Sequence, residues 1–244
     1  MNINKEISRS ATQVYVDEGL RQYMLRVYNY MTGGLTVTAL AAFIVMNSPA
    51  LISLFFNISP AGNIIGMSAL GWLMLFAPLI MVFAFGWVIA RGTTKQVQAT
   101  FWGFAAVMGI SLAPTLLIYT GASVTRVFLI TAAMFGGMSL YGYTTRRDLT
   151  SMGAFLRMGV WGLIIAMIVN LFLQSSGMQF VLSFLCVLIF TGLTAYDTQT
   201  IQRIYSEGDS SETATKKAVS GALSLYMDFI NIFISLLNLL GDRR

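Results

Sequence analysis

Histidine is absent from this sequence of 244 residues, and cysteine occurs only once. Without histidine the chain can build no Ser–His or Cys–His catalytic pair, no histidine-ligated zinc or haem, and no HExxH metalloprotease motif. The single cysteine, Cys186, lies inside an apolar run, which excludes a disulfide within the chain and a cysteine metal cluster. We therefore expect no enzymatic activity and no bound cofactor.

Charged residues are also scarce. They make up 10% of the chain, against about a quarter in soluble domains, while hydrophobic residues make up 56% and the mean hydropathy is +0.72. No Asp, Glu, Lys or Arg occurs in residues 27–90, 96–125 or 158–196. Uncharged apolar runs longer than about 18 residues are typical of membrane-spanning helices. The sequence therefore predicts an all-α polytopic membrane protein.

Seven spans of about 20 residues each fit these runs. They are predicted at residues 27–46, 67–90, 97–119, 124–143, 158–173, 180–199 and 218–240. Residues 51–60 are too few to span and are predicted to form an interfacial loop. Residues 1–26 form a polar segment without a signal-peptide core, followed by a single transmembrane domain, 27–244. Close helix contacts are expected at Gly33–Gly34, Gly136–Gly137 and Gly192.

Basic residues gather in alternate loops. They precede the first predicted span and follow the second, fourth and sixth, whereas the loops after the first and fifth spans carry no charge. The positive-inside rule places the N-terminus in the cytoplasm, so the net charge of +5 is explained by topology and predicts no nucleic-acid partner. Seven spans put the C-terminus outside, where Arg243 and Arg244 are unusual. Either they are tolerated there, or the last helix does not fully cross. A bacterial inner membrane fits the short loops, and an organellar membrane stays open.

Only two acids lie within the predicted spans, Asp197 and Asp228. An ionisable residue in a span is costly and normally faces the bundle interior or a water-filled cavity. Asp228 belongs to a polar stripe with helical spacing, formed by Ser224, Asp228, Asn231, Ser235 and Asn238, and Thr194 lies one turn before Asp197. A stripe of this kind predicts that the last helix lies inside the bundle.

The two acids can approach each other, because helix rise places both in the cytoplasmic half of the bundle. Arg91 ends the second span on the same side and is the nearest candidate cation for Asp197. Two carboxylates in a poorly solvated site cannot both ionise cheaply, so they would titrate as a pair. Such a pair can share a proton, bind a cation with the oxygens around it, or pass an ion. The alternative is that the polar side chains only hydrogen-bond neighbouring helices together.

Four motifs resemble the Bax inhibitor-1 family, the transmembrane Bax-inhibitor-motif superfamily, which has bacterial members. They are "MTGGLTVTALAA", "TRRDLTSMG", "AYDTQTI" and "ALSLYMDFINIFISLLNLLG". The resemblance implies seven spans, with the last one central and wrapped by the other six, and a proton-sensitive calcium leak. It also implies that Asp197 and Asp228 share a proton and transiently hold Ca²⁺, and that Arg91 latches the pore by pairing with Asp197. The charged C-terminal tail of eukaryotic members is missing here.

Other functions stay open. Bacterial members are implicated in restraining a membrane-bound quality-control protease, so the resemblance also allows a role in protein interaction, with residues 1–26 as the contact. An intramembrane aspartyl protease is a weaker alternative, because the residues at the second acid are "LYMD" instead of GxGD. A retinal-binding protein is disfavoured, since no lysine lies deep in the last span.

Overall fold

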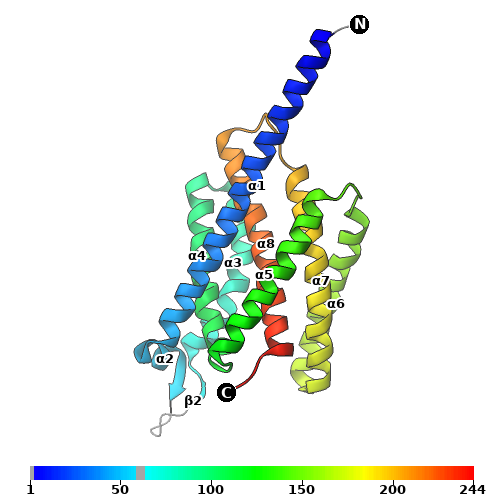
Figure 1. The fold of residues 1–244 in the computed structure, drawn as a ribbon. Helices are drawn as coiled ribbons and strands as arrows, with labels where there is room; N and C mark the ends of the chain where they lie inside the picture. The colour runs from blue at the N-terminus through cyan, green and yellow to red at the C-terminus, as the bar shows by residue number, and fades with distance from the viewer. Residues whose placement is uncertain (1–2, 59–63) are drawn as a thin grey trace.

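The computed structural model describes residues 3–58 and 64–244 of the chain. Its elements, in order, are α1 (Ile3–Met46), α2 (Pro49–Phe55), β1 (Phe56–Ile58), β2 (Ile64–Met67), α3 (Ala69–Arg91), α4 (Thr94–Leu117), α5 (Gly121–Thr144), α6 (Thr150–Leu173), α7 (Ser176–Arg203) and α8 (Ser211–Leu240). Within these described residues, seven helices are long and apolar enough to cross a membrane: α3 to α8 in full, and α1 from Glu18 onward. The prediction of an all-α polytopic membrane protein is confirmed (Figure 1).

Several helices extend further than the hydropathy pattern predicted. α6 begins at Thr150 instead of near residue 158, and α8 begins at Ser211 instead of near residue 218. The reason is capping, because Ser210 accepts a hydrogen bond from the Thr213 amide and so starts α8 in a polar segment. Charged residues on these first turns lie at the membrane boundary, where they do not oppose helix formation.

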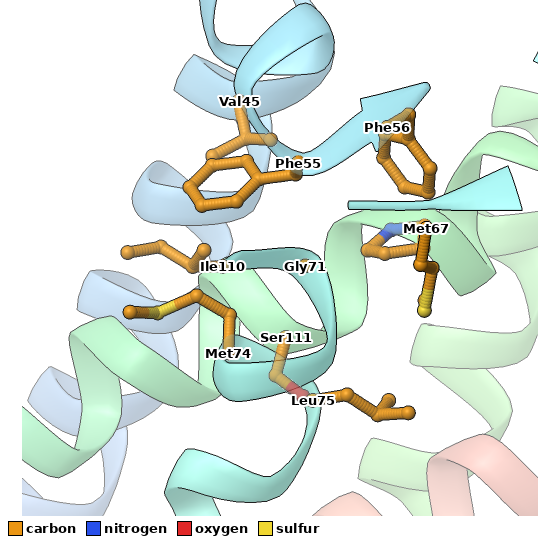
Figure 2. A pocket seen from close by; sticks show the side chains of 10 residues that line it. Val45, Phe55, Phe56, Met67, Gly71, Met74, Leu75, Ile110 and Ser111 are labelled. Carbon is orange, nitrogen blue, oxygen red and sulfur yellow. The ribbon is translucent and has the colours of Figure 1, made fainter. Parts of the chain in front are cut away.

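Residues 47–58 and 64–68 are more structured than the predicted interfacial loop, whose last two residues, 59 and 60, lie outside the described residues. They form α2 and a short antiparallel hairpin, in which Phe56 of β1 pairs with Met67 of β2. Phe55 and Phe56 are buried and pack with Val45 of α1. Figure 2 shows these side chains over α3 and α4, near Met74 and Ile110. The apolar run is too short to span, and it buries its aromatic residues against the end of the bundle instead.

α8 is the central helix, as expected, since 61% of its most apolar 18-residue stretch is buried inside the bundle. It packs mainly against α1, α4, α5 and α7. The resemblance implied that all six other helices surround it, and the structure modifies that picture. α3 packs mainly on α4 and α6 mainly on α7, so both lie at the periphery.

Glycines bring some helices together, but not all the predicted ones. A Cβ at Gly34 would meet the Phe101 ring, and one at Gly192 would meet Leu156, as expected for close contacts. The expectation is wrong for Gly136 and Gly137, where no atom lies within 4 Å of a Cβ position. The close approach on α5 occurs instead at Gly142, whose Cβ position meets the Ala195 backbone of α7.

The C-terminus docks at the end of the bundle opposite the start of α1 (Figure 1). The Arg244 amide donates to the Ile118 carbonyl at 2.9 Å, and the Thr120 amide donates to the Asp242 carbonyl at 3.0 Å. α8 has 30 residues, or about 45 Å, which exceeds the hydrocarbon thickness of about 30 Å. The last helix is therefore long enough to cross completely, which favours the reading in which Arg243 and Arg244 are tolerated outside. Asp242 also forms an ion pair with Arg126 at 2.9 Å.

Candidate ion and proton site

The two membrane acids lie on neighbouring antiparallel helices, Asp197 on α7 and Asp228 on α8. The register between these helices follows from two contacts. Ile201 lies against Gly221, and Ser235 lies near Cys186. This register places Asp228 level with Thr194, so the two acids differ in depth by about three residues, or about 5 Å. The predicted juxtaposition of two acids at similar depth therefore fits the packing of α7 on α8.

Asp228 is the more enclosed member of the pair. Its side chain is buried, with 4% of the residue exposed, and its Oδ2 has no hydrogen-bond donor among the residues that the structure describes. The charged group that acts on it is Asp197, and the interaction between two carboxylates is unfavourable. A buried carboxylate without a donor is expensive in its charged form. Asp228 is thus a group that holds a proton or needs a cation.

Asp197 has a different environment, because a cation acts on it. That cation is Arg157 of α6. The Arg157 guanidinium lies over the Tyr196 ring, 4.6 Å from its centre, and donates a hydrogen bond to the Tyr196 hydroxyl. Gly153, one turn earlier on α6, leaves room for the Tyr196 ring. Burial acts against the ionised form of Asp197, and the anchored charge of Arg157 offsets part of that effect.

The sequence reasoning did not assign a role to Arg157. It placed this residue in the loop before a span that was predicted to start at 158, because the charge-free run starts there. A local signal was available in the letters "DLT". Asp148 Oδ1 accepts hydrogen bonds from the Thr150 amide at 3.0 Å and the Thr150 hydroxyl at 2.6 Å, as an acid before a helix start does. A helix starting at Thr150 puts Arg157 two turns inside α6.

Arg91, the predicted latch, is exposed at the end of α3. Within residues 3–58 and 64–244, no ion pair involves its guanidinium. The pairing of Arg91 with Asp197 therefore stays a prediction. Arg157 is the cation whose charge acts on Asp197 in this conformation, from a distance longer than that of an ion pair.

The predicted polar stripe divides into two parts. At the far end, Asn238 accepts a hydrogen bond from the Tyr119 hydroxyl at 3.0 Å, which ties α8 to the loop after α4. Nearer the acids, the Thr194 hydroxyl donates to the Phe190 carbonyl, and the Asn231 amide donates to the Met227 carbonyl, both at 2.8 Å. Ser235 is buried, and Ser224 and Asn231 are half-buried. The hydroxyl oxygen of Thr194 and the amide oxygen of Asn231 are chemically suited to accept a hydrogen bond from a protonated acid or to ligate a cation.

The donor set suits a transient cation better than a tightly held one. Among the described residues, no group of three or more His, Cys, Asp or Glu side chains could hold a metal ion. Ca²⁺ takes six to eight oxygen ligands from carboxylates, carbonyl groups and water, and its affinity rises with the number of charged ligands. Two carboxylates supplemented by neutral oxygens can therefore attract Ca²⁺ and also release it.

Comparison with known proteins gives matches along almost the whole chain. Residues 20–244 match the protein family described as "Inhibitor of apoptosis-promoting Bax1". The uncharacterized protein RP147 of Rickettsia prowazekii is 41% identical over 244 residues, covering 100% of this chain and 99% of the relative. The inner membrane protein YbhL of Escherichia coli K12 is 37% identical over 238 residues, covering 97% and 98%. The matched region includes both acids and all seven apolar helices.

Proposed function

The chain belongs to the Bax inhibitor family and is an integral membrane protein, and from this premise we propose that it is a pH-sensitive leak channel for calcium. Asp197 and Asp228 are its sensor and ion site. The observation that carries the proposal is the buried Asp228 carboxylate, whose Oδ2 has no donor among the described residues and whose charged neighbour is another acid. The protein is not an enzyme in this proposal.

The physical basis is competition between a proton and a cation. When Asp197 is ionised beside Arg157, a second negative charge on the buried Asp228 is strongly unfavourable. A proton on Asp228 removes that charge, and a calcium ion between the two carboxylates compensates it. Calcium must displace the proton, so occupancy of the site by calcium rises with pH. The acids, Arg157 and the neutral oxygens of Thr194 and Asn231 are the groups that set this balance.

The test is calcium flux into liposomes that contain the purified protein, measured across a pH series. We expect the wild-type flux to depend on pH, and Asp197→Asn and Asp228→Asn each to remove that dependence. Asp242→Asn is the matched control, because Asp242 is an exposed acid at the far end, where its change should leave the profile intact. If both buried-acid variants keep the flux and pH profile of the wild type, the proposal is wrong.

The two arginines have separable roles in this proposal. Arg157 partly offsets the effect of burial, which acts against the charge on Asp197, so Arg157→Gln should shift the pH profile. Arg91 is the proposed latch and would pair with Asp197 in a different conformation of α3. Arg91→Gln should therefore raise the basal flux without moving the profile. An unchanged basal flux in Arg91→Gln would remove the latch from the mechanism.

A second candidate function is restraint of a membrane-bound quality-control protease. The observation that favours it is the length of α1, which has 44 residues, or about 66 Å, about twice the hydrocarbon thickness. Figure 1 shows its N-terminal part projecting from the bundle. Deletion of residues 1–17 should abolish the effect on the protease in cells and leave calcium flux unchanged. A cellular effect that survives the deletion would argue against this function.

The proposal places the protein in a bacterial inner membrane with its N-terminus in the cytoplasm. The ends of α3, α5 and α7 and the starts of α4, α6 and α8 share one end of the bundle with the start of the α1 span. Most of the basic residues lie at that end. Labelling of single cysteines introduced at either end, in a Cys186→Ala background, would show which end faces outward. Labelling of the α1 end by an impermeant reagent from outside would reverse the orientation.

A further inference from the structure

A groove of about 590 Å³ runs between α1 and α5, in the half of the bundle that contains the start of the α1 span. Its walls are largely apolar, and the residues used in this argument are Arg21, Met24 and Leu25 on α1, and Phe135, Gly136 and Leu140 on α5. Leu25 is 51% exposed and Leu140 is 63% exposed, so the groove opens sideways toward the surface that faces lipid.

The groove exists because α1 and α5 each pack against α8 and have few direct contacts with each other. Gly136 keeps it wide, since nothing lies within 4 Å of where its Cβ would be. The two helices are bridged at one point, where the Tyr28 hydroxyl lies 2.6 Å from Ser139 Oγ. This bridge closes the inner end of the groove, the end that lies deeper in the membrane.

The hydroxyl groups at this inner end are all satisfied. The Thr198 hydroxyl donates to the Thr194 carbonyl at 2.7 Å, so it accepts from Ser139, which lies 3.0 Å away. Ser139 in turn accepts from Tyr28. The chain of hydrogen bonds thus ends on a backbone carbonyl and does not lead to Asp197. An apolar group in the groove would leave no hydroxyl without a partner, so the inner end tolerates hydrocarbon.

The groove extends through about two thirds of one leaflet of a bilayer. From Arg21 to Tyr28, α1 rises about 10 Å, and one leaflet of hydrocarbon is about 15 Å thick. Arg21 and Tyr143 lie at the outer end, near the membrane boundary, while Tyr28 and Phe135 lie at the inner end. The groove therefore begins at head-group depth and follows the direction of an acyl chain.

The outer end carries positive charge. Arg21 is exposed, and its only ion pair among the described residues is a 3.5 Å contact with Glu18, also exposed. Exposed pairs of this kind are weak, so the guanidinium can exchange this partner for a phosphate, which arginine binds with two hydrogen bonds. Arg146 and Arg147 follow α5 by a few residues at the same end and add to the positive potential.

We propose that the groove between α1 and α5 binds one phospholipid with an anionic head group. One acyl chain lies along Met24, Leu25 and Leu140, over Gly136, and the phosphate contacts Arg21. Neither acid of the ion site takes part. The bound lipid is a structural ligand that fills the space between two helices around α8, and its binding is independent of calcium flux.

The groove itself is tested by filling it. Gly136→Leu places a side chain in the space for the acyl chain, and Gly137→Leu is the matched control, because Gly137 also faces open space and does not line the groove. Both changes replace a helical glycine by a strong helix former, so neither should impair folding. The protein is extracted from nanodiscs of equal parts phosphatidylglycerol and phosphatidylcholine, and retained lipid is counted by native mass spectrometry.

We expect wild-type protein and Gly137→Leu to retain one phosphatidylglycerol per chain. In Gly136→Leu the amount of retained phosphatidylglycerol should be lower by about tenfold or more. Equal retention by the Gly136 and Gly137 variants would overturn the proposal, and so would a wild-type protein that retains no lipid. The readout is bound lipid, so failure here leaves the flux proposal untouched.

The head-group contact is tested with a second pair of variants. Arg21→Gln should reduce the preference for phosphatidylglycerol over phosphatidylcholine about fivefold, the effect expected for one arginine near an anionic surface. Arg26→Gln is the control, because Arg26 is an exposed arginine of α1 outside the groove. Equal retention of the two lipids by wild type, or an equal loss of preference in both variants, would overturn the assignment of the phosphate to Arg21.

Discussion

A hydrogen bond between the Thr38 and Tyr226 hydroxyl groups joins α1 to the central helix α8. Mutation of Thr38 and mutation of Tyr226 should lower the stability of the protein by different amounts. Tyr226 lies on α8, two residues before Asp228, and is fully buried. Its hydroxyl is 2.6 Å from Thr38 Oγ1 of α1. Thr38 has one hydrogen and uses it on a backbone carbonyl, either Ala105 of α4 at 2.8 Å or Gly34 at 3.0 Å. Tyr226 is therefore the donor to Thr38.

This assignment predicts that Tyr226→Phe and Thr38→Val lower the free energy of unfolding by unequal amounts. Tyr226→Phe removes a donor and leaves Thr38 bonded to its carbonyl, so the loss should be about 0.5–1.5 kcal/mol, near the membrane-protein average of about 0.6 kcal/mol. Thr38→Val keeps the shape but leaves the Tyr226 hydroxyl buried without a partner, which should cost about 1–3 kcal/mol. The double variant should cost less than the sum of the two, because the orphaned hydroxyl is no longer present.

The measurement is unfolding of the four proteins in mixed micelles of mild detergent and dodecyl sulfate, followed by the loss of helical circular dichroism. The double-mutant cycle gives the coupling energy directly. Additive effects, or a Tyr226→Phe cost equal to that of Thr38→Val, would refute the assigned direction of the hydrogen bond.

Two further predictions concern the end of the bundle where α6 begins and the helix contacts. Hydrogen bonds from Thr150 and Arg203 lower the pKa of Asp148 to about 2 from its ordinary 3.8. Ionised Asp148 therefore contributes its full stabilisation of the folded protein above pH 3.8, and this contribution is lost as the pH falls toward 2. Melting temperatures of wild type and Asp148→Asn should thus differ at neutral pH and converge at pH 2; a constant difference would contradict this. Gly142→Ala should destabilise by about 1–3 kcal/mol, because its Cβ meets the Ala195 backbone, whereas Gly136→Ala should be neutral or stabilising. Equal melting temperatures for these two variants would show that the α5–α7 contact is looser than the structure indicates.

Much of the fold was predictable because the signals are local. Charge-free apolar runs identify spans regardless of how the helices pack, and all seven were found in this way. The similar depth of Asp197 and Asp228 was also accessible, since a short loop joins α7 to α8 and rise per residue then sets their relative depth, whereas proton sharing between them stays a prediction. The stripe through Asp228 indicated the central position of α8 by its periodicity alone.

Other features depended on contacts between residues far apart in the chain. The sequence did not reveal that Arg157 balances Asp197, because the span boundary was taken from hydropathy whereas the helix begins earlier, at its cap. It also could not tell Gly142, which contacts α7, from Gly136, which faces open space on the same helix.

The sequence by itself determined the number of spans, the two membrane acids and the stripe around one of them, because hydropathy and helical period act within one helix. Only the tertiary structure decided which cation lies beside Asp197, which glycines bring helices together, and where α1 and α5 separate to leave a groove. Those outcomes depend on how side chains of different helices fit against one another, and in a membrane that fit, together with hydrogen bonds between helices, selects the neighbours.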